Sequence, residues 1–117
     1  MIDFSFISNT LHIGTKKIDF QYEIWQVKEI GSLLIVTLAI PSNSNDIDNV
    51  YAVNNDCEMI WQIKSREKFQ KNYFKVPYVG VSIQGELIKA IDFCGARFLV
   101  DPRNGVIVGR DKNGRDW

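Results

Sequence analysis

The alternation of apolar and polar residues at a period of two constrains this chain more than any other feature. It runs through residues 2–6 (IDFSF) and again through residues 18–24 (IDFQYEI). Such alternation places one face of a β-strand on a core and the other face in water. Residues 32–40 (SLLIVTLAI) are apolar on both faces and rich in β-branched side chains. They predict a central strand that is covered on both sides.

The second half of the chain predicts a series of short hairpins. Segments 49–54 and 59–64 flank Asn-Asp-Cys-Glu, segments 79–84 and 87–93 flank Gly-Glu, and segments 97–101 and 106–108 flank Pro-Arg-Asn-Gly. In the last turn proline presets φ, and Gly105 adopts a positive φ without a steric penalty from Cβ. These hairpins favour antiparallel pairing throughout the second half.

Two stretches interrupt the strands. Residues 41–49 (PSNSNDIDN) lack periodicity, and their Ser, Asn and Asp side chains favour local hydrogen bonds to the backbone, so we expect a surface loop. Residues 65–73 (SREKFQKNY) leave one or two helical turns and an irregular loop equally open. The chain therefore predicts an all-β, mainly antiparallel fold with at most one short helix. Its 117 residues allow a single β domain over positions 1–117.

An internal repeat refines this expectation. Residues 51–54 (YAVN), followed by Trp61, align with residues 98–101 (FLVD), followed by Gly105, at a spacing of 47. Each copy has an aromatic residue on a strand and an Asx residue opening a turn. The spacing is similar to that of β-propeller blades, although Gly109 stands where a second tryptophan is expected. Because a closed ring needs four or more blades, we expect blade-like meanders that form an open or two-layered sheet.

Composition narrows the class of partner. Lysine plus arginine and aspartate plus glutamate both count 14, so the net charge is zero, whereas nucleic-acid-binding chains usually carry a basic excess. We expect no direct nucleic-acid partner. The start of the sequence has no signal-peptide pattern, and the longest apolar stretch, LLIVTLAI, is 8 residues long. We therefore expect a cytoplasmic protein with no membrane partner.

The residues that carry chemistry are sparse. His12 is the only histidine, and alternation places its side chain opposite its apolar neighbours, facing solvent or an interface. Cys57 and Cys94 are expected to be free thiols in a reducing compartment. Residues 111–116 (DKNGRD) superficially resemble a calcium loop but have glycine at the fourth position instead of the sixth. We predict no catalytic residues, no metal and no cofactor.

Some aromatic residues are expected in the core and others on the surface. Trp61 is expected in the core, whereas Trp25 is equally compatible with a second core and with an exposed anchor. A mixed cluster of aromatic and lysine residues over 68–78 favours a lid over the sheet, with a base-stacking nucleic-acid surface as the alternative.

Several motifs between residues 49 and 105 resemble a group of small bacterial proteins. They are NVYAV, a turn and IWQI, followed by a Tyr-x-x-Val segment, a Gly-x-Leu-Ile hairpin and an Asp-Pro-x-x-Gly turn. Such proteins sit beside polymorphic toxin genes, and some resemble immunity proteins of contact-dependent growth inhibition systems. The resemblance implies a non-enzymatic protein that neutralises a cognate toxin by stoichiometric contact.

A nuclease toxin would present a basic cleft, which favours clustered carboxylates on its inhibitor. The candidate partner-binding residues are therefore Asp46, Asp48, Asp56, Glu58 and Trp25. The competing interpretation is that these carboxylates are solvated turn residues. Two other functions stay open: a structural or scaffolding module that forms a homodimer through strand edges, and a small enzyme that uses Cys94 or His12.

Overall fold

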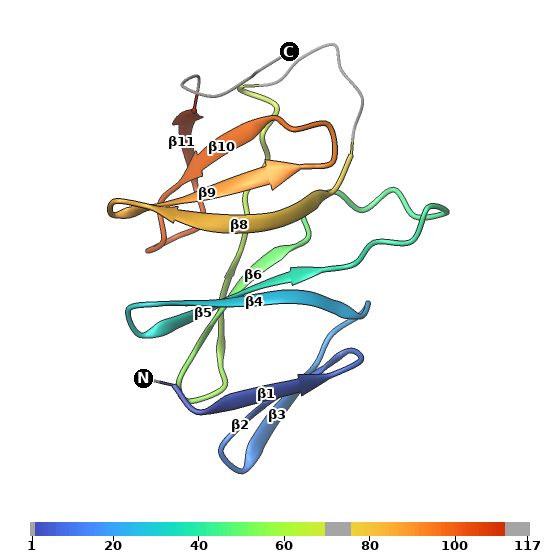
Figure 1. The fold of residues 1–117 in the computed structure, drawn as a ribbon, viewed down its shortest axis with the longest axis vertical. Coiled ribbons are helices and arrows are strands. Elements are labelled where there is room, and N and C mark those ends of the chain that lie inside the picture. Colours follow the sequence, from blue (N-terminus) through green and yellow to red (C-terminus); the bar gives the residue numbers. More distant parts are fainter. Residues whose placement is uncertain (1, 70–75, 112–117) are drawn as a thin grey trace.

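The chain folds into three antiparallel sheets that follow one another along its long axis (Figure 1). A computed structural model describes residues 2–69 and 76–111. Over these residues the chain forms 11 strands and no helix, so no helix here could cross a membrane. The all-β, antiparallel prediction is confirmed.

Each sheet is a meander in which strands adjacent in sequence are adjacent in space. The N-terminal sheet contains β1 (Phe4–Ile7), β2 (Thr10–Ile13) and β3 (Lys16–Asp19). The middle sheet contains β4 (Ile24–Ile30), β5 (Leu33–Leu38), β6 (Val50–Asn54) and β7 (Met59–Gln62). The C-terminal sheet contains β8 (Tyr78–Gln84), β9 (Leu87–Asp92), β10 (Arg97–Val100) and β11 (Ile107–Arg110).

β5, a central strand of the middle sheet, is buried on both faces, as the apolar run through residues 32–40 predicts. Leu34 and Val36 on β5 pack with the apolar residues of the N-terminal sheet. Ile35 on β5 and Ala52 on β6 belong to a second core that they share with the C-terminal sheet. The first 40 residues therefore have two roles: β1–β3 form a facing layer, and β5 pairs directly with β6 of the second half.

The internal repeat corresponds to equivalent strands of two blade-like meanders. β6 and β10 are each the third strand of a four-stranded sheet. Both sheets shift register at the corresponding step, between Ala52 and Val53 and between Leu99 and Val100. Trp61 lies opposite Ala52, and Gly109 lies opposite Leu99, so glycine does occupy the tryptophan position of the second copy.

That register shift also corrects one detail of the sequence pattern. Strict alternation places Met59 on the same face as Trp61. Trp61 is 5% exposed, which confirms its place in the core, but Met59 is 46% exposed. The irregularity in the β6–β7 pairing breaks the alternation between the two residues.

Trp61 ties the middle sheet to the C-terminal sheet. Its indole Nε1 donates a hydrogen bond of 2.8 Å to the carbonyl oxygen of Pro102, in the β10–β11 turn. Gly105 in the same turn has a φ of +76°, and a Cβ there would lie 2.6 Å from Cε3 of Trp61. The turn thus needs glycine twice, for its backbone conformation and for the close approach of the indole.

Residues 65–73, for which the sequence leaves both a short helix and an irregular loop open, are described only in part. Residues 67–69 form a turn, in which the amide of Phe69 donates to the carbonyl oxygen of Arg66 at 2.9 Å. The rest of the predicted helix or loop, with the predicted lid residues Tyr73 and Phe74, lies outside the described residues. The same holds for most of the 111–116 stretch.

Candidate functional site

The predicted surface loop after β5 borders a polar cavity of about 290 Å³. We call this cavity the acidic pocket, since the carboxylates of Asp46 and Asp48 are the charged groups in its lining. Its walls come from the loop, from β5 and β6, and from the residues just before β4. They consist of Gln21, Tyr22, Leu38, Ile40, Asn45, Asp46, Ile47, Asp48, Asn49, Tyr51 and Gln62.

Asp46 is held at the outer side of the pocket. The hydroxyl of Tyr22 donates to Oδ2 of Asp46 at 2.5 Å, and the amide of Gln21 reaches the same oxygen at 3.4 Å. The hydroxyls of Tyr22 and Ser44 lie 2.9 Å apart, and the backbone amide of Asp46 donates to Oγ of Ser44. These contacts fix the loop against the segment that precedes β4.

Asp48 is half-buried at the inner side. Its Oδ1 is inaccessible to solvent and has no hydrogen-bond partner among the described residues. Burial raises the pKa of the Asp48 carboxyl, Glu67 and Asp46 raise it further, and Arg66 partly offsets them. Burial, Asp46 and Asp48 likewise raise the pKa of Tyr51 in the pocket wall. The pocket therefore holds negative charge in a place that disfavours it.

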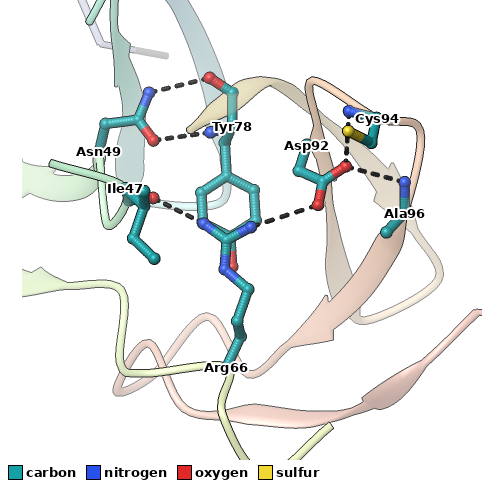
Figure 2. Close-up of polar contacts among 7 residues, drawn as sticks. All are labelled: Ile47, Asn49, Arg66, Tyr78, Asp92, Cys94 and Ala96. Atoms are coloured by element: carbon teal, nitrogen blue, oxygen red, sulfur yellow. Dashed lines mark hydrogen bonds and ion pairs between the residues drawn. The ribbon is translucent and has the colours of Figure 1, made fainter. Parts of the chain in front are cut away.

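The loop is anchored from below by a fully buried arginine (Figure 2). Nη2 of Arg66 donates to the carbonyl oxygen of Ile47 at 2.7 Å, and Nη1 lies 3.3 Å from Oδ2 of Asp92. The guanidinium stacks on the ring of Tyr78, with its Cζ 4.0 Å from the ring centroid. Asp92 in turn accepts hydrogen bonds at Oδ1 from the amides of Cys94 and Ala96.

Asn49 completes this buried network. Its side chain donates to the carbonyl oxygens of Leu38 and Tyr78 and accepts from the amide of Tyr78 at 2.8 Å. In this way the last residue of the loop bridges β5 of the middle sheet and β8 of the C-terminal sheet, as Figure 2 shows for its two bonds to Tyr78. The loop that carries Asp46 and Asp48 is therefore held at both ends.

An apolar groove of about 200 Å³ lies between β4 and β8. Trp25 and Phe93 border it with 64% and 73% of their surfaces exposed, which settles Trp25 as a displayed residue. Trp25 and Val79 each lie at a register irregularity, on β4 and β8 respectively. β-Bulges redirect side chains, so these irregularities account for two apolar residues that point outward. The groove lining is Trp25, Leu38, Ala39, Ile40, Pro77, Tyr78, Val79 and Phe93.

The acidic pocket and the apolar groove are parts of one surface. Ile40 lines both, and it also lines a third hollow formed with Gln21, Tyr22, Glu23, Ala39 and Pro41. We call the three together the Ile40 surface. Its carboxylates are Glu23, Asp46 and Asp48, and no lysine or arginine is among the described residues that line it.

The other two predicted contact carboxylates lie elsewhere. Asp56 and Glu58 belong to the β6–β7 turn, at the opposite end of β6 from Asp48. The backbone carbonyl of Asp56 accepts from Lys16 of the N-terminal sheet at 3.4 Å, and Oε1 of Glu58 accepts from Asn54 at 3.0 Å. The structure brings Asp46, Asp48 and Trp25 onto one surface and leaves Asp56 and Glu58 apart from them.

Comparison with known families gives one match. Residues 1–112 match the family described as "Domain of unknown function (DUF7957)". The chain belongs to this family. No curated protein matches the chain. The family description gives no activity or partner.

The remaining candidate residues of this DUF7957 member occupy ordinary positions. His12 on β2 points outward between buried Leu11 and Ile13, as alternation predicts. Cys57 and Cys94 are free thiols in the turns after β6 and β9. Within residues 2–69 and 76–111, no three His, Cys, Asp or Glu side chains gather closely enough to hold a metal ion.

Several residues that line the Ile40 surface, and the buried Arg66 that supports its loop, are not identified by the sequence pattern. Phe93 follows β9 and reads as the end of a strand, while Tyr22 and Tyr51 read as core positions of alternating strands. Arg66 reads as part of a polar helix or loop. A buried arginine has no local signal, since its partners Ile47 and Asp92 lie on two other segments that are distant in the sequence.

Proposed function

We propose that this protein is an immunity protein that binds and neutralises a cognate bacterial toxin by stoichiometric contact through the Ile40 surface. The observation that carries the proposal is the pair of exposed aromatic side chains, Trp25 and Phe93, on the rim of an apolar groove. Aromatic residues in such positions dominate the binding energy of protein interfaces.

The composition of the surface supports a protein partner. An apolar centre with a polar margin is typical of protein interfaces, and here the groove lies beside hollows that contain Glu23, Asp46 and Asp48. A nuclease toxin is the partner class that this charge fits best, because its cleft must attract a phosphate backbone.

Co-expression with the product of the neighbouring gene, which the proposal expects to be a toxin, tests the proposal. We expect the pair to purify as a complex whose mass by light scattering equals one copy of each chain, and we expect growth to be rescued. A toxin that stays separate from this chain and still arrests growth would contradict it.

The alternative is a scaffolding module that self-associates through strand edges. It is favoured by β7 and β11, which are the edge strands of the middle and C-terminal sheets that take no part in the β4–β8 contact. Light scattering on the free chain separates the two functions: the immunity proposal predicts a monomer that the toxin captures, and scaffolding predicts a stable homodimer.

A further inference from the structure

We infer that the acidic pocket is a subsite for one basic side chain, an arginine or lysine, that the toxin inserts beside Asp46 and Asp48. This inference rests on the proposed function and specifies the chemistry of the partner at that surface. The apolar groove would hold an apolar side chain of the same partner segment, because Ile40 and Leu38 line both hollows.

Charge complementarity is the first argument. Asp46 and Asp48 form no ion pair with any described residue, although lysines and arginines are as numerous as acidic residues in the chain. Arg66 lowers the pKa of the Asp48 carboxyl, but its guanidinium is bonded to Asp92 and to the carbonyl oxygen of Ile47. The pocket therefore presents negative charge for which the described residues supply no direct counter-ion.

The state of Asp48 is the second argument. One of its carboxylate oxygens is removed from water without gaining a hydrogen bond from the described residues. Such a group is unfavourable in the free protein, and a cation held beside the other, solvent-accessible oxygen of the same carboxylate stabilises its charge. The groups that set the charge around it are Asp46 on the loop, Tyr22 before β4, Tyr51 on β6, and Arg66 with Glu67 after β7.

Size and lining favour a side chain over a metal ion. Calcium takes six to eight oxygen ligands, and the lining brings two carboxylates together with amide side chains, but Oδ2 of Asp46 already accepts hydrogen bonds from Tyr22 and Gln21. Its volume of about 290 Å³ lies just below the range of drug-sized sites and suits a single side chain. The rings of Tyr22 and Tyr51 in the wall add surfaces that attract organic cations.

The test uses the free protein, so that it does not depend on the toxin. N-acetyl-arginine methylamide is titrated into ¹⁵N-labelled protein at low salt and pH 7. We expect saturable shifts centred on the amides of residues 46–49, and at least fivefold weaker binding by Asp48→Asn and Asp46→Asn. Asp3→Asn removes an exposed charge outside the pocket and should leave the binding unchanged.

A second probe and a second readout keep the inference falsifiable. N-acetyl-norleucine methylamide, which lacks the charge, should produce no saturable shifts, and the pKa of the Asp48 carboxyl should fall when the arginine probe is bound. Equal binding of the two probes, an unaffected Asp48→Asn variant, or tighter binding of calcium chloride would each overturn the inference. If the protein binds the arginine probe but does not bind the toxin, the proposed function is wrong and the subsite is retained.

Discussion

At the scale of single residues, Asp48 shows a conflict between stability and recognition. Its pKa is raised in the folded protein, chiefly by burial, so the folded state binds the proton more tightly than the unfolded state. The stabilising effect of protonation is present below the unfolded pKa and is lost as the pH rises through the folded pKa. At neutral pH the ionised Asp48 therefore destabilises the fold.

We predict that Asp48→Asn raises the melting temperature at pH 7, while it weakens binding of the basic probe. Because the neutral amide has no charge to desolvate, the gain should shrink toward zero as the pH falls below 4. Thermal denaturation of both proteins between pH 3 and 8 measures this. A variant less stable than the parent at pH 7 would show that Asp48 is a structural residue.

Asp101 shows the opposite shift. Hydrogen bonds from Arg103, first from its side chain and then from its backbone, lower the pKa of the Asp101 carboxyl to about 2. Its contribution to stability is thus present above the ordinary aspartate pKa and is lost as the pH falls through about 2. We predict that Arg103→Ala moves this pKa back toward 3.8, as followed by carboxyl NMR chemical shifts. An unchanged titration would mean that the backbone alone lowers it.

Arg66 is fully buried and sets the position of the pocket loop through its hydrogen bond to the carbonyl oxygen of Ile47 and its ion pair with Asp92. We predict that Arg66→Met costs about 3–5 kcal/mol in urea unfolding, because it leaves the Asp92 carboxylate buried without this ion pair. The double variant with Asp92→Asn should recover part of the loss, since an amide oxygen can still accept from Cys94 and Ala96. A double variant less stable than Arg66→Met would contradict this explanation.

At the scale of elements, the β10–β11 turn packs closely against Trp61 on β7 of the middle sheet. Gly105→Ala combines a positive φ with an approach of 2.6 Å to Trp61, and we predict a loss of about 2–5 kcal/mol. Gly85→Ala is the matched control, because its φ is +61° and its added Cβ meets nothing within 4 Å. The control should lose about 1–2 kcal/mol in the same denaturation experiment. Equal losses would show that the contact with Trp61 is unimportant.

The elements were largely predictable because their signals are local. Turn residues anticipate the hairpins of the second half, and the repeat at a spacing of 47 anticipates the equivalence of β6 and β10. The alternation over residues 18–24 predicts one strand and is wrong there, because β3 ends at Asp19 and β4 begins at Ile24. The register irregularities at Trp25 and Val79 were not predictable, since they depend on pairing with a partner strand and leave no mark on the strand itself. These irregularities create the apolar groove.

At the scale of the whole molecule, the candidate site lies where distant segments meet. Trp25, Asp46 and Phe93 come from parts of the chain that have no local relation, and only the stacking of the sheets brings them to one surface. Sequence reasoning named Trp25, Asp46 and Asp48 by residue type, but it could not separate them from Asp56 and Glu58. Those four carboxylates differ in burial and neighbours and do not differ in local pattern.

The central claim is that the Ile40 surface binds the toxin, and growth rescue in cells that express the neighbouring toxin tests it most directly. The parent chain and Ile60→Ala, which truncates a half-exposed apolar residue on β7, should both restore growth. Trp25→Ala combined with Phe93→Ala should abolish rescue, with an affinity loss of about 100-fold or more and little change in stability. Full rescue by this folded double variant, or failure of the parent chain to rescue, would contradict the account.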